Sequence, residues 1–240
     1  MKSELLAKNG LINYISGSEF DISYIRQKEK LKEYMDGLFK KLDLDPDQVY
    51  YGVQLHTDKI KYCDGENGDD FLCGKIFEET DGLITDKKNL ALVIKFADCT
   101  PVLLFDPVKK VQACVHSGWR GTTKRISEKA IEKMVNDFSC EKENILAYLG
   151  PSIDQDNYEV GQDVYDAFKD FKNRDKFFVD YKEKYKLDMI AANLDILLEA
   201  GIKKENIEIS NISTYNDLKL NSARRQKENY KLNGIISLIK

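Results

Sequence analysis

Histidine is almost missing from this sequence, with two residues among 240. A multicopper oxidase needs many imidazoles, because imidazole is the usual ligand of the several copper ions in such a centre. Two histidines cannot supply a trinuclear copper cluster. The low histidine content therefore excludes that kind of oxidase.

Long apolar runs are also missing. No run approaches the roughly 20 residues that a helix needs to cross a bilayer, and the opening stretch, MKSELLAKNGLINY, has no apolar core of the length of an export signal. The five cysteines are an odd number, which argues against a disulfide framework. We therefore expect a cytoplasmic protein with no membrane partner.

An excess of basic charge is missing as well. The formal net charge is −4, whereas binding to nucleic acid requires a basic face, so we expect no nucleic-acid partner. Arginine is scarce, with six residues among the 37 basic ones. The planar arginine fork suits the recognition of oxyanions, whereas lysine makes a general solvated surface. The arginine positions are therefore informative.

The spacing of apolar residues predicts both helices and strands. Helical spacing predicts helices over residues 22–41, from Thr122 or Thr123 to about Phe138, over 160–171 and over 187–201. Apolar runs or alternation predict strands over residues 49–58, 111–119, 145–153 and 207–214, and two strands or one bent strand over 90–107. Because helices and strands do not alternate regularly, we expect an α+β fold, with mixed β-sheets flanked by helices. The absence of repeats and linkers predicts a single domain over residues 1–240.

Scarce residue types gather in the segment HSGWRGTT, which holds a histidine, the only tryptophan and an arginine. His116 in this segment, His56 in VQLHT and Cys99 in FADCTP lie on or at the ends of predicted strands. Two imidazoles and a thiolate would suit a zinc ion that keeps a fourth position for water, whose pKa falls towards about 7. The gaps of 43 and 17 residues match no local zinc signature.

Two other interpretations of these residues are open. Cys99 could be a nucleophile with His116 or His56 as its base, in which case Asp98 would point to the opposite side of a strand. Alternatively, both histidines could be hydrogen-bonded in a core. A separate theme is anion recognition by Arg120, which precedes a predicted helix start, with Arg224 and Arg225 adding to it from the tail.

Five motifs occur in order along the chain, namely QLH (54–56), DGLIT (81–85), ADCTPVLLFDP (97–107), HSGWRGT (116–122) and LGPSIDQDNYEVGQDV (149–164). Together they resemble the laccase-domain, or polyphenol oxidase-like, family. Its members are described as zinc-dependent purine nucleoside phosphorylases with adenosine deaminase activity. The resemblance covers residues 50–165 and, more faintly, the tail.

The resemblance implies a zinc enzyme. The zinc ligands of the family fall on His56, Cys99 and His116, which implies one zinc ion per chain. These residues and Arg120 would form the catalytic set. Phosphorolysis requires phosphate as a co-substrate, and Arg120 and Arg225 are the candidates to bind it. The implied substrates are small purine nucleosides, namely adenosine, inosine, guanosine and methylthioadenosine.

The resemblance also implies a fold similar to that of a bacterial toxin deamidase that works through cysteine and histidine. A cysteine hydrolase or peptidoglycan-precursor editing enzyme therefore remains an alternative, as do a non-catalytic nucleoside-binding module and a polyphenol oxidase. Whether the chain is a monomer or a homodimer is left open.

The sequence departs from the family pattern at both ends. The segment SGSEFDIS does not match the usual N-terminal motifs, and the tail LNSARRQ keeps Ser222, Arg224 and Arg225. Ser213 stands where a cysteine is common. We therefore expect an intact metal site with altered substrate contacts. Asp98 is expected to support the site, and Glu159 is a candidate general acid.

Overall fold

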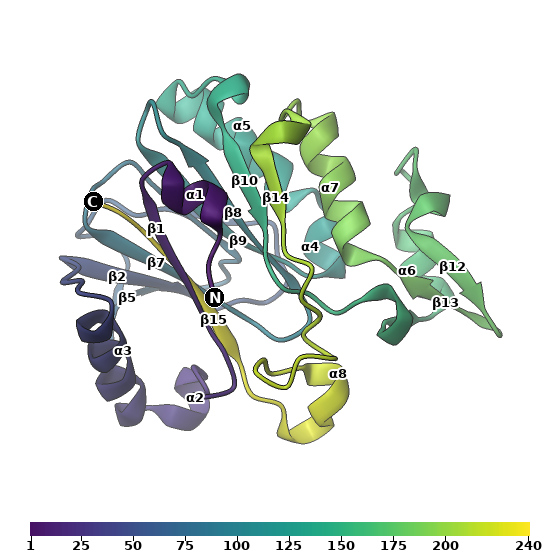
Figure 1. Ribbon diagram of the computed structural model, residues 1–240, viewed down its shortest axis with the longest axis horizontal. Helices are drawn as coiled ribbons and strands as arrows, with labels where there is room; N and C mark the ends of the chain where they lie inside the picture. The colour runs from purple at the N-terminus through teal and green to yellow at the C-terminus, as the bar shows by residue number, and fades with distance from the viewer.

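Two six-stranded sheets lie face to face at the centre of the protein (Figure 1). The structure is a computed structural model that describes residues 1–240 apart from the side chain of Glu29. Sheet one has the strand order β1-β15-β7-β2-β5-β4, and sheet two has the order β14-β10-β8-β9-β6-β3. The strands of sheet one are β1 (Leu11–Ser16), β2 (Gln48–Gly52), β4 (Asp69–Phe71), β5 (Gly74–Phe77), β7 (Leu90–Phe96) and β15 (Asn233–Ile239). Those of sheet two are β3 (Ile60–Tyr62), β6 (Gly82–Thr85), β8 (Thr100–Asp106), β9 (Val111–Ser117), β10 (Leu146–Leu149) and β14 (Ile207–Ile209).

Helices cover the outer face of each sheet (Figure 1). On sheet one, α3 (Glu29–Lys41) packs through a core that joins its apolar side to Ala91 and Val93 of β7. On sheet two, α5 (Ile126–Phe138) and α7 (Met189–Glu199) share a core with β8, β9 and β10. The shorter helices are α1 (Glu4–Lys8), α2 (Tyr24–Gln27), α4 (Trp119–Thr123), α6 (Gln162–Ala167) and α8 (Ala223–Gln226). This arrangement of mixed sheets between helices confirms the predicted α+β class.

The segment over residues 90–107 forms two strands that belong to different sheets. β7 lies in sheet one, β8 lies in sheet two, and the chain crosses between them at Ala97–Cys99. The space between the sheets takes alternate residues of β7, β8 and β9, namely Leu90, Leu92, Ile94, Phe96, Leu103, Phe105 and Cys114. The alternation predicted for β9 is confirmed, because Val111, Ala113 and Val115 pack on the helix side instead. His116 therefore continues the face that points between the two sheets.

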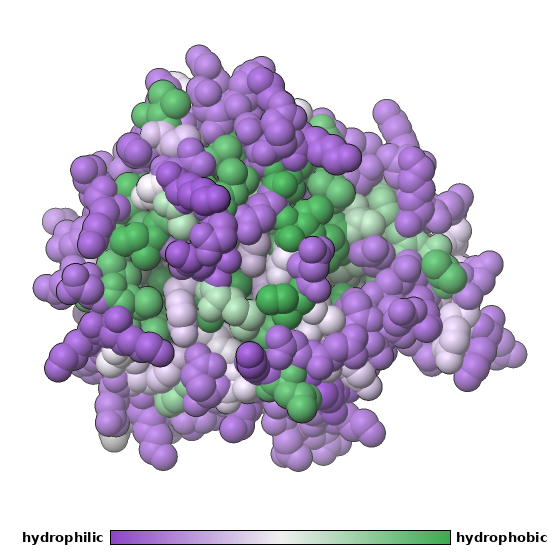
Figure 2. Space-filling view, viewed as in Figure 1, coloured by the Kyte–Doolittle hydropathy of each residue, from purple (hydrophilic) through white to green (hydrophobic). Residues whose placement is uncertain are grey.

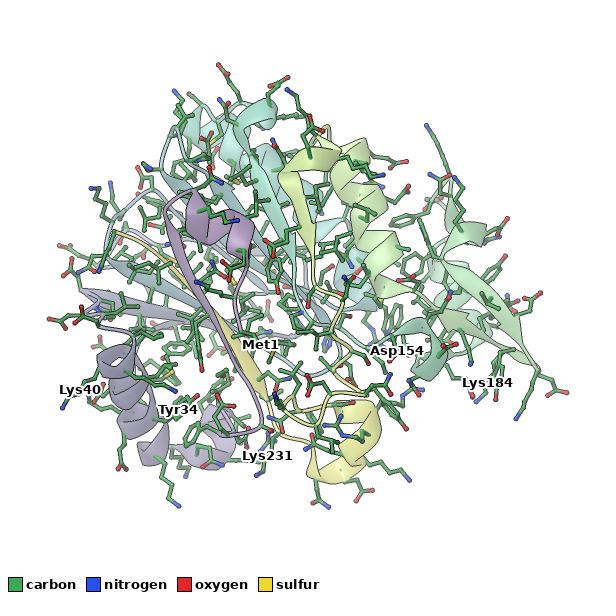
Figure 3. All side chains as sticks on the ribbon, viewed as in Figure 1. Met1, Tyr34, Lys40, Asp154, Lys184 and Lys231 are labelled. Atoms are coloured by element: carbon green, nitrogen blue, oxygen red, sulfur yellow. The ribbon has the colours of Figure 1, made fainter. Side chains whose placement is uncertain are left out.

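A small third sheet extends to one side of the sheet pair. It has the order β11-β13-β12, formed by β11 (Glu159–Val160), β12 (Phe178–Tyr181) and β13 (Lys184–Leu187). Lys184, labelled in Figure 3, lies at the outer end of this extension. An aromatic core joins the sheet to α6 and α7. The extension starts at Glu159, close in sequence to Tyr158, which lines the pocket described below.

Two of the predicted helices are interrupted by residues with positive φ. The predicted helix over residues 22–41 is wrong in its continuity, because Lys28 adopts φ +38 between α2 and α3. Similarly, Arg125 adopts φ +58 between α4 and α5. A right-handed helix cannot contain such a residue, so each segment becomes two helices.

Other elements are shorter than predicted. The predicted helix over residues 160–171 is reduced to α6, because Val160 pairs with β13 instead. The strand predicted over 207–214 ends at Ile209. The N-terminal strand β1 was not predicted, although it pairs along its whole length with β15.

The face shown in Figure 2 is largely hydrophilic, with groups of apolar residues between the hydrophilic ones. All five cysteines are free thiols in the described structure. Within the described residues, no helix combines the length and the apolar content that crossing a bilayer requires.

Candidate metal centre

Two segments that cross between the sheets and the end of strand β9 bring His56, Cys99 and His116 together. His56 lies on the connection from β2 to β3, and Cys99 lies on the crossing from β7 to β8. His116 is the second-last residue of β9, which is followed by α4. Potential ligand atoms of the three side chains all lie within 4.8 Å of one another. Residues far apart in the sequence thus form one cluster, as the zinc hypothesis requires.

The spacing of these atoms suits a single metal ion. The Cys99 Sγ atom lies 3.8 Å from His56 Nε2. In a tetrahedral zinc site, bonds of about 2.3 Å to sulfur and 2.0–2.1 Å to nitrogen place these atoms about 3.6 Å apart. The two imidazole rings are tilted by 59° with centroids 5.0 Å apart, so they approach the thiol from different directions. Such a donor set could hold one metal ion with little movement.

The charges around Cys99 favour the thiolate that metal binding requires. Burial acts to raise the pKa of the Cys99 thiol, but His116 and then His56 outweigh it and lower this pKa to about 6. Burial acts in the opposite direction on His116, yet the neighbouring Cys99 and Asp81 raise its pKa to about 9. A thiolate with its imidazolium partner is thus the stable charge arrangement of the metal-free cluster.

Asp81 is a positioning residue that sequence reasoning missed. It is fully buried just before β6, and its Oδ1 atom lies 2.9 Å from Nδ1 of His116. The backbone amide of His116 also donates to the carbonyl oxygen of Asp81, at 2.7 Å. A carboxylate that holds one ring nitrogen leaves the other nitrogen, Nε2, directed towards the cluster. The only sequence signal was the acidic first position of DGLIT.

The same carboxylate shapes the loop that carries His56. It accepts hydrogen bonds from the backbone amides of Leu55, His56 and Thr57, at 3.1, 3.1 and 2.7 Å. His56 itself adopts φ +57. The strand predicted over residues 49–58 therefore ends at Gly52. The backbone amides of residues 55–57 donate to the Asp81 carboxylate instead of to the carbonyl groups of a neighbouring strand.

Gln54 fixes the start of this loop to sheet one. Its side-chain nitrogen donates to the carbonyl oxygen of Lys95 at 2.7 Å, and its side-chain oxygen accepts from the amide of Lys95 at 2.9 Å. The amide side chain thus imitates a pairing strand at the end of β7. The glutamine of the QLH motif therefore positions the histidine two residues later.

Gly118 provides the space in which the cluster forms. A Cβ atom at this position would lie 2.7 Å from Cδ2 of His56 and 2.8 Å from Sγ of Cys99. Its backbone, with φ −73 and ψ 169, is accessible to any residue. The glycine in HSGWRG is therefore required by close approach to the ligands and not by an unusual backbone conformation.

A pocket of about 660 Å³ opens beside the cluster. Its lining combines the cluster with aromatic and cationic side chains and comprises Gln54, His56, Lys95, Phe96, Ala97, Asp98, Cys99, His116, Trp119, Tyr158, Ala223, Arg224, Lys227, Tyr230 and Leu232. The guanidinium of Arg224 lies 5.3 Å from the ring centroid of Tyr158. This volume and lining are typical of a site for a small organic ligand.

Asp98 connects the tail to the loop of Cys99. Its two carboxylate oxygens accept from Oγ1 of Thr214 and from the amide of Arg224, each at 2.6 Å. Asp98 adopts φ +83 in the bend between β7 and β8, so the expectation that it lies on a strand is wrong. Ser222 completes the connection by accepting a hydrogen bond from the amide of Arg225 as the N-cap of α8.

The structure places the other candidate residues outside this lining. Arg120 is exposed, with its guanidinium 4.2 Å from the ring centroid of Trp119, which does line the pocket. The guanidinium of Arg225 donates to the backbone carbonyl groups of the tail, including that of Thr214 at 2.7 Å. Glu159 pairs with Lys184 at 2.6 Å on the small third sheet. The structure thus brings His56, Cys99 and His116 together and leaves Arg225 and Glu159 engaged elsewhere.

Lys95 is a further pocket residue that the sequence did not indicate. It is 7% exposed, and burial lowers the pKa of its ammonium group to about 7, although the charge of Asp81 acts in the opposite direction. In an unfolded chain the lysine remains protonated up to its usual pKa of 10.5. The unfolded state therefore binds more protons than the folded state between pH 7 and 10.5.

We expect the stability of the metal-free protein to rise with pH over this interval because of Lys95. The penalty for burying the charge is complete below pH 7 and disappears as pH approaches 10.5. Lys95→Met should remove this rise and increase the free energy of unfolding at pH 7 by about 1–3 kcal/mol. Urea denaturation of both proteins between pH 7 and 10 measures the difference. Parallel stability curves would contradict the prediction.

Comparison with known proteins gives the same family over most of the chain. Residues 18–238 match the family model described as multi-copper polyphenol oxidoreductase laccase. A Bacteroides thetaiotaomicron protein named purine nucleoside phosphorylase is 30% identical over 198 residues, covering 79% of this chain and 72% of that protein. A protein named adenosine deaminase RL5, from an unknown prokaryotic organism, is 36% identical over 152 residues, which cover 62% of this chain and 58% of that protein.

Solved structures show the same fold. The crystal structure of YlmD from Geobacillus stearothermophilus superposes with a TM-score of 0.86 and 21% identity, and the match covers 99% of this chain and 94% of that one. The structure thus shows the likeness in fold, and the match over residues 18–238 establishes membership of the family. The chain belongs to the family described as multi-copper polyphenol oxidoreductase laccase, whose relatives here are named as nucleoside-processing enzymes.

Proposed function

We propose that this protein is a zinc-dependent purine nucleoside phosphorylase with adenosine deaminase activity. The observation that carries the proposal is the cluster of His56, Cys99 and His116 at the edge of a pocket of about 660 Å³. Support also comes from the names of the relatives, which are purine nucleoside phosphorylase and adenosine deaminase. The substrate class is therefore small purine nucleosides, including adenosine, inosine, guanosine and methylthioadenosine.

One zinc ion per chain would be held by His56 Nε2, Cys99 Sγ and His116 Nε2. Zinc with three protein ligands supplies a Lewis acid that lowers the pKa of water in its free position. The residues of the chain provide its geometry: Asp81 holds Nδ1 of His116, and the loop fixed by Gln54 presents His56. The donor set excludes a multicopper centre, because two histidines cannot supply the imidazoles that such a centre needs.

The aromatic residues of the pocket suit a purine ring. Tyr158 is partly exposed and lines the pocket beside Trp119, and Arg224 lies against the Tyr158 ring. Base rings stack on such aromatic faces and on guanidinium planes. We infer that the purine lies against Tyr158, with Asp98 holding Arg224 in place through the backbone of the tail.

Phosphorolysis would join a phosphate oxygen to the anomeric carbon of the nucleoside. The bond from that carbon to the purine nitrogen breaks, the purine keeps the electron pair and takes up a proton, and a sugar phosphate leaves. Arg120 is a candidate for the phosphate because it follows the cluster at α4 and carries a free guanidinium face. Arg225 is less suited to this role because its guanidinium holds backbone carbonyl groups.

Metal removal is expected to abolish both activities. Protein loaded with zinc is incubated with adenosine, with and without phosphate, and the products are separated by chromatography. We expect inosine without phosphate and adenine or hypoxanthine with ribose phosphate when phosphate is present. Chelation, with removal of the metal verified by elemental analysis, should reduce the rates of deamination and phosphorolysis by at least about 100-fold. A metal-replete protein that forms none of these products would refute the proposed function.

A second function deserves a test because one observation favours it. Cys99, His116 and Asp81 form a nucleophile, a base and an orienting carboxylate, with the His116–Asp81 contact at 2.9 Å. This is the arrangement of a cysteine hydrolase or a peptidoglycan-precursor editing enzyme. The proposed similarity to the toxin deamidase fold belongs to this alternative.

Chelation and mutation separate the two functions. Cys99→Ser removes a nucleophile and also weakens a metal site, so it inactivates both kinds of enzyme. Thorough chelation inactivates only the metal enzyme. Activity that survives with metal verified absent would therefore favour the cysteine hydrolase, and nucleoside binding without turnover would favour a binding module. Cytoplasmic location and a monomeric or homodimeric state remain predictions.

A further inference from the structure

The two chain neighbours of Cys99 are held by one buried hydroxyl group, that of Ser152. Ser152 follows β10 and is 3% exposed. Its Oγ atom donates to the carbonyl oxygen of Asp98 at 2.9 Å and lies 2.9 Å from Oγ1 of Thr100. A carbonyl oxygen can only accept, so the one hydroxyl proton of Ser152 goes to Asp98, and Thr100 donates to Ser152. Ser152 therefore holds the chain one residue before and one residue after Cys99.

Thr214 closes a ring of hydrogen bonds through Asp98 and Ser152. Its hydroxyl donates to Oδ1 of Asp98 at 2.6 Å, and its backbone amide donates to the carbonyl oxygen of Ser152 at 3.0 Å. The three residues come from the crossing between β7 and β8, the chain after β10 and the chain after β14. All three are buried, and hydrogen bonds away from water are electrostatically stronger than exposed ones. The Asp98–Ser152–Thr214 ring thus joins three distant segments beside Cys99.

The ring holds a backbone conformation that is unfavourable for Asp98. This residue adopts φ +83, in a region that sterics disfavour for side chains with a Cβ atom. Such conformations persist only where the surroundings over-determine them. The carbonyl oxygen of Asp98 accepts from Ser152 and from the amide of Ile153 at 3.0 Å, and both of its carboxylate oxygens are engaged. The bend held in this way leaves Cys99 Sγ 3.8 Å from Nε2 of His56.

The tail residue before Thr214 is fixed to the same segment as Ser152. Ser213 forms an isolated parallel bridge with Ser152. Its hydroxyl donates to the carboxylate of Asp154, labelled in Figure 3, which also accepts from Nδ2 of Asn216 at 3.0 Å. Ser213 stands where the family resemblance places a cysteine. In this chain a hydrogen-bonded serine therefore anchors the part of the tail on which the ring depends.

We propose that Ser152 and Thr214 are positioning residues for the candidate metal ligand Cys99. The inference rests on the zinc site of the proposed function, but it requires no nucleoside. Neither residue is one of the three candidate ligands or lines the pocket, so both act through Asp98 and Thr100. Outer partners that orient a metal ligand are needed for full metal affinity.

A purely structural role for the ring makes a different prediction. If the hydroxyl groups only stabilised the fold, their removal would lower the free energy of unfolding as the loss of any buried hydrogen bond does. The affinity for zinc and the geometry of the bound metal would then stay unchanged. A positioning role predicts that the affinity and the geometry both change.

The test uses the full-length protein and the ring variants Ser152→Ala and Thr214→Val, each of which removes one hydroxyl group. Thr214→Ser keeps the hydroxyl and is the conservative variant. The matched control is Thr85→Val, at the last residue of β6 and outside the pocket lining. It removes a fully buried hydroxyl group that donates to the carbonyl oxygen of Cys63 at 2.7 Å.

Three measurements are made on the same samples. Zinc affinity is measured by competition between the metal-free protein and a coloured chelator. Urea unfolding of the metal-free protein reports stability. Absorption spectra after loading with cobalt(II) report the coordination geometry and the charge-transfer band of a thiolate ligand.

We expect zinc affinity to fall by about 10- to 100-fold in Ser152→Ala and in Thr214→Val. The thiolate band of the cobalt-loaded protein should weaken or shift in both ring variants. Thr214→Ser and Thr85→Val should stay within about threefold of the wild-type affinity, whatever stability they lose, because neither removes a hydroxyl group from the ring.

Unchanged zinc affinity in both ring variants would overturn the inference, and so would an equal fall in Thr85→Val. A wild-type protein that binds no zinc would overturn it as well, because no metal ligand would then be positioned. Should Thr214→Val fail to fold, Ser152→Ala decides the matter alone, since it removes only a hydroxyl oxygen.

The failure of this inference is distinguishable from the failure of the proposed function. Zinc affinity that falls in the ring variants, in a wild-type protein that converts no nucleoside, would support the inference and refute the proposed function. Nucleoside conversion by the zinc-loaded wild type, with unchanged zinc affinity in the ring variants, would do the reverse.

Discussion

Gly118→Ala is expected to prevent metal binding while leaving the fold intact. The added methyl group would lie 2.7 Å from the His56 ring and 2.8 Å from the Cys99 sulfur, so these two ligands cannot both keep their positions. Alanine tolerates the backbone conformation at this position, so the loss comes from contact with the ligands alone. We expect metal affinity to fall by at least about 10- to 100-fold, as it does when the support of a ligand is removed.

The matched control is Gly37→Ala on α3. A Cβ atom there meets nothing within 4 Å, and alanine in a helix is favoured over glycine by about 0.5–1 kcal/mol. Elemental analysis after zinc loading and dialysis, with thermal unfolding of the same samples, measures both effects. We expect one zinc per chain for Gly37→Ala and little for Gly118→Ala, which should nevertheless unfold cooperatively as an intact fold does. Full zinc content in Gly118→Ala would show that the ligands adjust without cost.

Asp81→Asn is expected to have the second large effect, on metal affinity and on stability together. The carboxylate serves His116, Thr57 and the amides of the His56 loop. An amide of the same size keeps the shape but loses the charge and presents donors to groups that are donors themselves. We expect zinc affinity to fall about 10- to 100-fold and the free energy of unfolding of the metal-free protein to fall by about 3–5 kcal/mol.

The pH dependence of the stability lost in Asp81→Asn follows from the titration of Asp81 and of its partner His116. Burial opposes ionisation of Asp81, but His116 and the loop amides outweigh it and lower its pKa from 3.8 to about 2. Its contribution is present above pH 3.8 and is lost as pH falls through 2. The contribution of His116, with its raised pKa, is complete below pH 6.5 and is lost as pH rises through 9.

Denaturant unfolding of metal-free wild-type and Asp81→Asn protein between pH 4 and 9 tests this expectation. The difference between them should be greatest near pH 5–6, where both partners are charged. Asp81→Ala tests the same pair without adding a donor. A constant difference across the whole pH range would show that Asp81 acts through packing alone.

The three candidate ligands could be found from the sequence because histidine is so scarce in it. In a chain with two histidines, their coincidence with a cysteine near strand ends made a metal site one of three interpretations, and the resemblance to the laccase-domain family made it the leading one. The alternation in β9 also predicted which face carries His116. The strand assigned to His56 was wrong because side chains took over the backbone pairing: Gln54 pairs with β7, and Asp81 takes the loop amides.

The supporting residues were not predictable in the same way. Aspartate is common, and only the folded chain shows that the Asp81 carboxylate joins two other segments, the loop of residues 55–57 and the end of β9. Arg224 and Arg225 are neighbours, yet the start of α8 turns one towards Tyr158 and the other towards carbonyl groups of the tail. Lysine usually lies on the surface, so no periodicity could mark Lys95 as buried.

The position of β15 has a consequence for how the protein assembles. This strand lies between β1 and β7, and Leu11 pairs with Ile239 across nearly the whole chain. β1 must therefore wait for β15 before sheet one is complete, and contacts so distant in sequence slow folding. The residues just before β15 line the pocket, so a growing chain carries an unfinished site until this segment has been synthesised.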